Sequence, residues 1–319
     1  MNTDVTVLVG DVGGSNTRLA LAGPEIGVTA LKSFDNDSFT SLEDVLTAYR
    51  AQPDLPDFQG ACIAVAGPVY GDKYRLTNRA WQGDASTLAA RLQLADGARM
   101  DLINDLAALG HSLPVLSPGQ LSSLRAGPQL GDQSLVVGLG TGFNVSLVAG
   151  AHTAGAEMGH ADLPTPVYKK LQAALGREPD EFNTNEDLFS GHGLVRFHQA
   201  MSGVAIAGGA QLMNDYLADP NSAAARTVET WAEMLGLFSY NLVPTYMPGQ
   251  GLFFAGSVSR GVLGSPAQIQ FLEGFSQGGG LLQEQCRQIP LWVITDDAAG
   301  VSGSARVALE AVTGASNPS

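Results

Sequence analysis

The sequence predicts an α/β fold made of two duplicated domains. Three observations lead to this prediction: a length of 319 residues, the alternation of strand-like and helix-like segments, and a glycine-containing hairpin that occurs twice. A chain of this length exceeds the size at which one hydrophobic core usually keeps growing, so two domains are expected. A cleft between two such domains is a natural ligand site.

Strand-like and helix-like segments alternate along the whole chain. The strand-like runs are 61–66, 252–255 and 291–294, and the segments with helical patterning are 42–51, 105–113, 223–242 and 304–312. Alternation of this kind is typical of α/β proteins.

A strand, a glycine turn and a second strand are predicted for residues 5–22, and the same order returns at 135–149. The second turn, 138–142, has three glycines in five positions. Four residues match at a constant offset of 128: Gly10 with Gly138, Gly14 with Gly142, Asn16 with Asn144, and Leu19 with Leu147. These matches favour a duplicated domain, and a chance likeness between two glycine-rich hairpins is the alternative.

Composition and charge argue against several classes of partner. The formal net charge is −14, whereas nucleic acids and anionic membrane surfaces need a concentrated basic face. No stretch approaches the roughly 18 apolar residues of a membrane-spanning helix, and the N-terminus lacks a basic signal region. The two cysteines, Cys62 and Cys286, form no metal or redox motif and indicate a reducing compartment. We therefore expect a cytoplasmic protein without nucleic-acid or membrane partners.

Both glycine turns are suited to phosphate binding. A phosphate chain must approach backbone amides closely, and residues without a Cβ allow this. Beside the first turn, Asp11 can hold Mg²⁺ through water; in the second, Thr141 can donate its hydroxyl to a phosphate oxygen. Neither turn has the Walker A or the Rossmann spacing. Ordinary hairpin turns are the alternative for each copy taken alone.

Asn104 and Asp105 lie where a predicted strand, 100–103, meets the helix-like segment that follows. This junction is a cleft-edge position in α/β folds. This position would place the Asp105 carboxylate beside a bound ligand. The alternative is that Asp105 only caps the helix.

Residues 157–160, Glu-Met-Gly-His, are predicted to form a loop or a single turn because their surroundings are rich in Gly, Ala and Pro. The Glu-x-x-His spacing occurs once and outside a long helix, which argues against a metal site of the di-iron type. Polar residues that stabilise a loop are the alternative to a binding role.

The order of these motifs resembles that of the bacterial glucokinase family over nearly the whole chain. The matching segments are Asp-x-Gly-Gly-[ST]-Asn at 11–16, Leu-Thr-Asn-x-x-Trp at 76–81, Asn-Asp at 104–105, Gly-x-Gly-Thr-Gly at 138–142, Glu-x-Gly-His at 157–160 and Glu-x-x-x-Ser-Gly-x-Gly-Leu at 186–194. Residues 251–257 are similar to the family's adenosine-side strand.

The resemblance implies two duplicated ribonuclease H-like (actin-like ATPase) domains with an interdomain cleft. The smaller domain is expected at 1–108 with 302–319, and the larger at 109–301. The implied activity is ATP- and Mg²⁺-dependent phosphorylation of glucose at its 6-hydroxyl by a cytoplasmic homodimer. A kinase for mannose or fructose and a catalytically silent sugar sensor remain alternatives.

The resemblance also implies roles for individual residues. Asp105 is the general base, and Asp11 holds Mg²⁺ through water. The residues expected to bind the sugar substrate are Asn104, Glu157, His160, Glu186, Thr77 and Asn78. Those expected to bind ATP are Asp11, Gly13, Gly14, Ser15, Asn16, Gly138, Gly140, Thr141, Gly142, Gly256 and Ser257.

Five positions depart from the family pattern: Leu139, Phe143, Asn144, Met158 and Ser257. We expect the added side chains at Asn144 and Ser257 to narrow the nucleotide site. Met158, between two sugar-binding residues, is expected to change which sugar fits or how tightly.

Overall fold

The computed structural model describes residues 5–24, 27–95, 97–280 and 282–314. The chain divides into two compact units, which we call unit 1 (Met1–Leu116 with Asp297–Ser319) and unit 2 (Ser117–Asp296). The boundaries expected from the sequence, 108 and 302, fall inside helices α3 (Asp105–Ser112) and α12 (Ala299–Thr313). These two helices pack against each other within unit 1.

Unit 1 is built on a five-stranded sheet in the order β3-β2-β1-β4-β8. The strands are β1 (Val7–Val12), β2 (Asn16–Gly23), β3 (Gly27–Asp35), β4 (Gly60–Val65) and β8 (Arg99–Asn104). The first three strands are antiparallel neighbours, whereas β1, β4 and β8 run parallel. A small antiparallel sheet follows β4, with β5 (Val69–Tyr70), β6 (Lys73–Arg75) and β7 (Gln82–Asp84).

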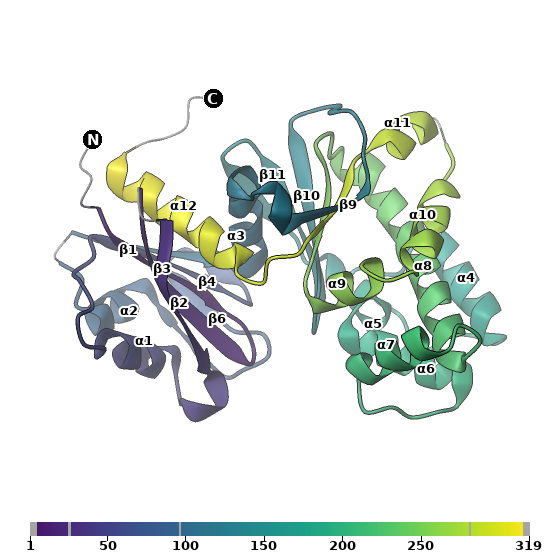
Figure 1. Cartoon of the computed structure of the whole chain (residues 1–319), viewed down its shortest axis with the longest axis horizontal. Helices are drawn as coiled ribbons and strands as arrows, with labels where there is room; N and C mark the ends of the chain where they lie inside the picture. The colour runs from purple at the N-terminus through teal and green to yellow at the C-terminus, as the bar shows by residue number, and fades with distance from the viewer. Residues whose placement is uncertain (1–4, 25–26, 96, 281, 315–319) are drawn as a thin grey trace. The chain divides into compact units, whose positions relative to one another are not determined.

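Helices cover both faces of this sheet, as Figure 1 shows. On one face, Leu8 and Val12 pack in a cluster with residues of α1 (Leu42–Arg50) and α2 (Ala85–Leu92). On the other face, Val7 and Val9 pack with residues of α12. Alternate residues of β1 therefore serve two cores, so β1 is apolar along most of its length.

Unit 2 repeats this arrangement. Its sheet has the order β12-β11-β10-β13-β14-β9, and its first five strands correspond to β3-β2-β1-β4-β8 in both sequence order and direction. The strands are β9 (Leu121–Arg125), β10 (Gln133–Leu139), β11 (Phe143–Ala149), β12 (His152–Gly155), β13 (Gly251–Ala255) and β14 (Leu291–Ile294). This shared topology confirms the duplicated α/β fold.

The two hairpins differ in the length of their turns. Gly10 of β1 pairs with Leu19 of β2, whereas Gly138 of β10 pairs with Asn144 of β11. The second turn is thus three residues shorter. A constant offset of 128 cannot hold on both arms of the hairpin, so Leu147 does not occupy the position of Leu19. The duplication is real, but the four sequence matches do not give its structural alignment.

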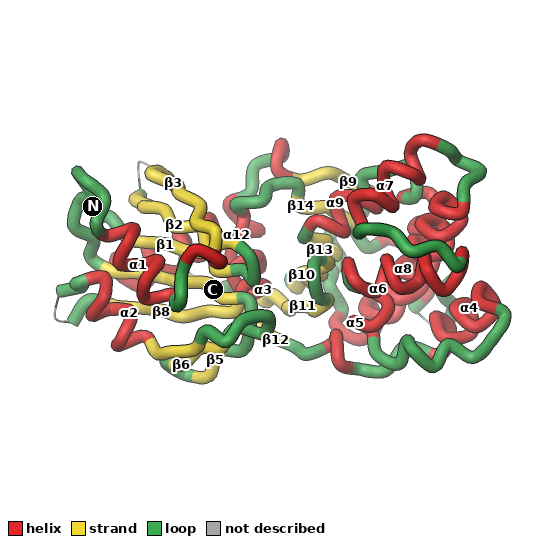
Figure 2. The backbone as a smooth tube through the Cα atoms, turned by 90° about the horizontal axis from the view of Figure 1, so that it is seen from below, coloured by secondary structure: helices red, strands yellow, loops and turns green. Residues whose placement is uncertain are grey.

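The helices of unit 2 gather around α8 (Ala223–Tyr246), as Figure 2 shows for α4, α6 and α7. Trp231 and Phe238 of α8 are buried in the core, and the helix continues past Pro244 for another two residues. The other helices of this unit are α4 (Thr165–Leu175), α5 (Asn185–Leu188), α6 (Gly191–Ser202), α7 (Gly209–Ala218), α9 (Ser257–Leu263), α10 (Gln268–Ser276) and α11 (Gln283–Gln288). Short 3₁₀ turns occur at Asn36–Ser38, Leu113–Val115, Pro118–Gln120 and Met158–His160.

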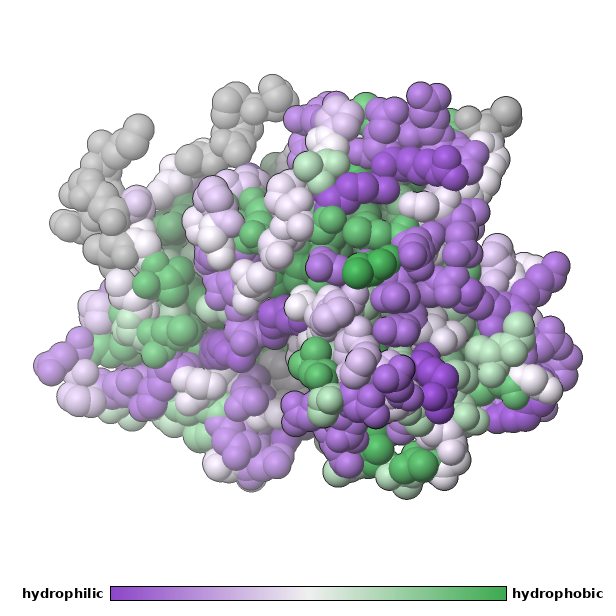
Figure 3. All heavy atoms as spheres, turned by 45° about the vertical axis from the view of Figure 1, so that its right-hand side comes forward, coloured by the Kyte–Doolittle hydropathy of each residue, from purple (hydrophilic) through white to green (hydrophobic). Residues whose placement is uncertain are grey.

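Hydrophilic side chains cover much of the visible face of unit 2, with apolar side chains in smaller groups (Figure 3). Within the described ranges, no helix has the length and apolar character needed to cross a membrane. Both cysteines are free and buried.

Candidate active site: two glycine turns and their neighbours

The predicted residues of unit 1 meet at one edge of its sheet. Strands β1, β4 and β8 are parallel and in register, with Asp11 opposite Ala64 and Val65 opposite Asn104. The carboxyl ends of the three strands therefore lie at the same edge, which is where α/β sheets bind ligands. The turn after β1 and the Asn104–Asp105 junction after β8 both belong to this edge.

Residues 77 and 78 belong to the same edge. The Thr77 amide donates to the Ala66 carbonyl, 3.1 Å away, directly after β4. A Cβ placed on Gly14 would lie 3.5 Å from the Cβ of Asn78. The side chains of Thr77 and Asn78 are exposed, so their polar groups are free to face a ligand.

The first glycine turn is held by its carbonyl groups. The Gly13 amide donates to the Asn16 carbonyl at 2.9 Å. The buried Asn36 side chain donates to the Gly13 carbonyl at 2.9 Å, and Arg79 Nε donates to the Gly14 carbonyl at 2.9 Å. These contacts fix the backbone while Ser15 and Asn16 stay exposed.

Asn36 and Arg79 are functional candidates that the sequence analysis missed. Arg79 also donates to the Asn36 carbonyl at 3.1 Å and forms an ion pair with Asp37 at 2.5 Å, and its guanidinium stacks over Trp81. Asn36 lies 23 positions from Gly13, and Arg79 lies 65 positions from Gly14. No local pattern in the sequence links segments so far apart.

Asp11 combines burial with one opposite charge. Its carboxylate is 20% exposed and lies 3.5 Å from Arg18 Nη1. Burial raises the pKa of Asp11, and the charge of Arg18 opposes this change. A Cβ on Gly300, in the first turn of α12, would lie 3.4 Å from the Asp11 carboxyl carbon, so the carboxylate is near the positive end of that helix.

Asp105 is the first residue of α3, and Asn104 is the N-cap. The Asn104 Oδ1 accepts from the Leu106 amide at 3.0 Å, and its Nδ2 donates to the Gly67 carbonyl at 3.1 Å. The capping role considered for Asp105 therefore belongs mainly to Asn104, although Asp105 Oδ1 also accepts from the Leu106 amide. Burial, with a further contribution from the negative charge of Asp11, raises the pKa of Asp105 to about 7.

The second glycine turn lies among close neighbours of unit 2. The Gly140 amide donates to the Gly142 carbonyl at 3.0 Å, and the Gly140 carbonyl accepts from the Gly191 amide at 2.8 Å. Gly256, with φ +100°, approaches the Leu139 carbonyl so closely that a Cβ would overlap it. Gly256 and Ser257 thus stand beside this turn, and Thr141 is exposed on it.

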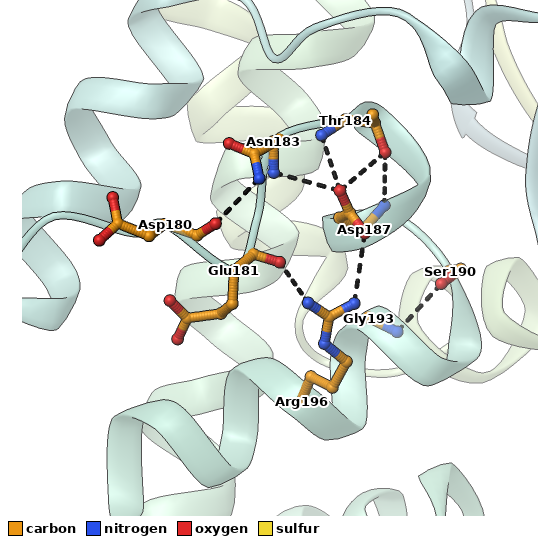
Figure 4. Close-up of polar contacts among 8 residues, drawn as sticks. All are labelled: Asp180, Glu181, Asn183, Thr184, Asp187, Ser190, Gly193 and Arg196. Atoms are coloured by element: carbon orange, nitrogen blue, oxygen red, sulfur yellow. Dashed lines mark hydrogen bonds and ion pairs between the residues drawn. The ribbon is translucent and has the colours of Figure 1, made fainter.

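Glu186 contacts the same turn. Its Oε2 accepts from the Phe143 amide at 2.9 Å, and a Cβ on Gly142 would lie 2.6 Å from that oxygen. Glu186 is carried by α5, which Figure 4 shows to be anchored by polar contacts. Thr184 and Asp187 cap the helix reciprocally, and Arg196 binds both Asp187 and the Glu181 carbonyl.

The Glu157–His160 segment packs against the start of β11. It forms a single turn, one of the two forms that the sequence predicted, with His160 N donating to the Glu157 carbonyl at 3.1 Å. A Cβ on Gly159 would overlap the Phe143 carbonyl, so only glycine fits there. Asn185 of α5 donates to the Met158 carbonyl at 2.8 Å. Glu157 and His160 are exposed.

The five departures from the family pattern lie in different surroundings. Leu139 and Phe143 are buried in the unit 2 core, and Met158 packs against it. The Asn144 side chain donates to the Glu157 carboxylate and accepts from the Met158 amide, so its hydrogen bonds are made to the predicted sugar segment. Ser257 is exposed at the start of α9.

The residues of unit 1 fit a hydrated magnesium ion. No group of three or more His, Cys, Asp or Glu suited to a metal occurs among the residues that the structure describes. Mg²⁺ does not require such a group, because it keeps several waters and is usually held by one or two carboxylates together with substrate phosphates. Asp11 supplies a partly exposed carboxylate beside the glycine turn, and its charge adds to that of Asp105.

Two α/β units with the same strand order and a glycine turn at corresponding strand ends define a protein of the actin-like ATPase-domain class. Solved structures agree: a glucokinase from an Antarctic psychrotroph has a TM-score of 0.79 at 26% identity, covering 95% of this chain and 98% of its own. A Balamuthia mandrillaris glucokinase in complex with glucose has a TM-score of 0.75 at 18% identity, over 95% of this chain and 93% of its own, and supports the fold alone.

The family model for glucokinase matches residues 8–311, and the chain therefore belongs to the glucokinase family. Among curated relatives, the glucokinase of Colwellia psychrerythraea is 27% identical over 95% of this chain and 96% of its own length. The glucokinase of Photorhabdus laumondii is 29% identical over 93% of this chain and 95% of its own. The chain is an enzyme of this family, as the sequence motifs predicted.

Proposed function

We propose that this protein transfers the γ-phosphoryl group of ATP to the 6-hydroxyl of glucose. The observation that carries the proposal is the meeting of Asp105, Asp11 and the first glycine turn at one sheet edge of unit 1. Family membership supports the reaction type. Further support comes from a related fold, a Streptomyces griseus glucokinase in complex with glucose and AMPPNP, with a TM-score of 0.65 at 18% identity.

Asp105 is the base in this proposal. Its carboxylate accepts the proton of the 6-hydroxyl while that oxygen forms its bond to the γ-phosphorus, and the bond from phosphorus to the ADP oxygen breaks. A pKa near 7 suits a base at neutral pH, because the ionised form is present and still binds a proton well. Asn104 orients Asp105 through the helix cap.

The phosphates are assigned to the backbone amides of the two glycine turns and to the Ser15 and Thr141 hydroxyls. When bound, Mg²⁺ neutralises phosphate charge, with Asp11 holding it through water. Gly256 and Ser257 are assigned to the adenosine side. The fixed carbonyls of the first turn keep its backbone in one conformation, so little order is lost when ATP binds.

The sugar hydroxyls are assigned to Asn104, Glu157, His160 and Glu186, with Thr77 and Asn78 beside them. Carboxylates suit this role because each oxygen accepts hydrogen bonds from hydroxyl groups. Glu186 links the two sites, since the same side chain also accepts from the Phe143 amide of the second turn. A homodimer and a cytoplasmic location belong to the proposal as well, and two free buried cysteines are consistent with a reducing compartment.

The test is an ATP-coupled assay with glucose, mannose, fructose and glucosamine, with and without Mg²⁺. Turnover with glucose at the highest kcat/KM, lost on removal of Mg²⁺, supports the proposal. A higher kcat/KM for mannose or fructose favours the other-hexose kinase. Glucose binding without ADP production favours the sensor.

A further inference from the structure

Asn144 is the one family departure whose side chain makes specific polar contacts with the predicted sugar segment. In the family pattern this position is glycine, which has no side chain to contribute. In this chain, the carboxamide lies between β11, where Asn144 resides, and the turn that begins at Glu157. The carboxamide can therefore affect how Glu157 is oriented for substrate binding.

The carboxamide makes three hydrogen bonds. Its Oδ1 accepts from the Val145 amide at 2.9 Å and from the Met158 amide at 3.0 Å, and its Nδ2 donates to Glu157 Oε2 at 3.2 Å. This orientation follows from the partners, because the reverse would place NH₂ against two N–H donors and an oxygen against a carboxylate. Only an amide side chain of this length both accepts and donates here.

We infer that Asn144 is a positioning residue that fixes the Glu157 carboxylate for the sugar. The inference rests on the proposed function, in which Glu157 accepts hydrogen bonds from hydroxyl groups of the substrate. Glu157 is exposed, and an exposed glutamate ordinarily samples several rotamers, whose loss on binding weakens affinity. The Nδ2 contact holds one carboxylate oxygen, and the Met158 contact holds the backbone beside it. Glu157 is therefore ordered before the sugar arrives.

Nucleotide binding should not depend on this contact, because Glu157 and Met158 lie on the sugar segment. The second glycine turn is held separately, by Gly191 at Gly140 and by Glu186 at Phe143. An effect on glucose without an effect on ATP would therefore separate a positioning role from a general structural one.

The first variant is Asn144→Ala, with Asn221→Ala as the matched control, an exposed asparagine of unit 2 ahead of α8. Loss of a hydrogen bond to a charged group predicts an increase in the KM and Kd for glucose of about tenfold. The KM for ATP should change by less than about twofold. The control should leave all three constants and the melting temperature unchanged.

The second variant is Asn144→Asp, studied by calorimetric glucose binding without nucleotide between pH 5.5 and 8.5. At high pH the introduced carboxylate repels Glu157 and has no proton to donate, so glucose binding should be weaker than in Asn144→Ala. At low pH the introduced carboxyl group takes up a proton because a like charge lies beside it, which restores a donor to Glu157, and affinity should recover. The neighbouring titratable groups, Glu157, His160 and Glu186, are the same in the wild type, which should lack this recovery.

The inference would be overturned if Asn144→Ala bound glucose as tightly as the wild type, or if the variant lost affinity for glucose and ATP equally. Glucokinase activity of the wild type would in that case leave the proposed function intact. No glucose binding or turnover by the wild type would instead overturn both.

Discussion

The buried carboxylate of Asp105, the proposed base, should lower the free energy of unfolding, and Asp105→Asn should raise it. The carboxylate is raised in pKa from 3.8 to about 7, mainly by burial. A shift of this size corresponds to about 4 kcal/mol of stability at high pH. Asparagine keeps the same shape and an oxygen that can accept from the Leu106 amide, so the variant should be more stable than the wild type.

The pH dependence gives the sign. Because the folded pKa is above the unfolded one, the folded state holds its proton more tightly, and stability falls as pH rises from about 4 to about 7. Asparagine has no such dependence. The stability gain of Asp105→Asn should therefore grow by about 2 kcal/mol between pH 5.5 and pH 8.5.

The assay is the thermal unfolding of the wild type and of Asp105→Asn across this pH range. The lower limit of pH 5.5 avoids precipitation near the sequence pI of about 4.6. The expected gain is several degrees in melting temperature at pH 8.5. Asp84→Asn is the matched control, because hydrogen bonds from Ser86 and Thr87 lower the pKa of Asp84 at the start of α2 and so predict no gain. A gain at Asp105 that is absent or the same at every pH would refute the reasoning. Asp105→Asn should also lose turnover by about 10²–10⁴-fold while still binding glucose.

Three further outcomes follow from the site. The kcat of the wild type should rise with pH through about 7, as Asp105 ionises, in a pH–rate profile at saturating substrates; a flat profile would argue against Asp105 as the base. Arg79→Ala should raise the KM for ATP about fivefold through loss of the Gly14 contact, with the KM for glucose as the internal control. Gly256→Ala should destabilise unit 2 by about 2–3 kcal/mol, because its φ is +100° and a Cβ overlaps Leu139. Gly261→Ala in α9, the helix that begins directly after Gly256, should not lower the melting temperature, because a Cβ has room there.

Much of the fold was predictable because its signals are local. Short apolar runs gave β4, β13 and β14 within one residue at each end, and helical patterning gave α1 and α3. The end of α8 was placed too early, at 242, because the pattern gave no reason to continue through Pro244. The offset of 128 failed because a turn can lose residues while both strands keep their pairing.

The placement of the candidate site residues was predictable where the signal is local, as for the glycine turns between paired strands and the Asn104–Asp105 junction between strand and helix. It was not predictable where a contact joins distant segments. Asn36 holds Gly13 from the 3₁₀ turn after β3, and Asn144 reaches Glu157 only because the chain folds back onto β11. The pKa of Asp105 likewise depends on Asp11, which the sequence places 94 residues earlier but the fold places on the same sheet edge.

The return of α12 to unit 1 has a consequence for synthesis on the ribosome. Val7, Val9 and Ala20 share a cluster with Val301, Ala305 and Ala308, so one face of the N-terminal sheet stays bare until nearly all of the chain has been translated. Unit 2, which is continuous in sequence, is complete before that moment. Unit 1, most of which is synthesised first, is thus the last to finish folding. A nascent chain stalled before residue 299 would expose an apolar face of its sheet to chaperones.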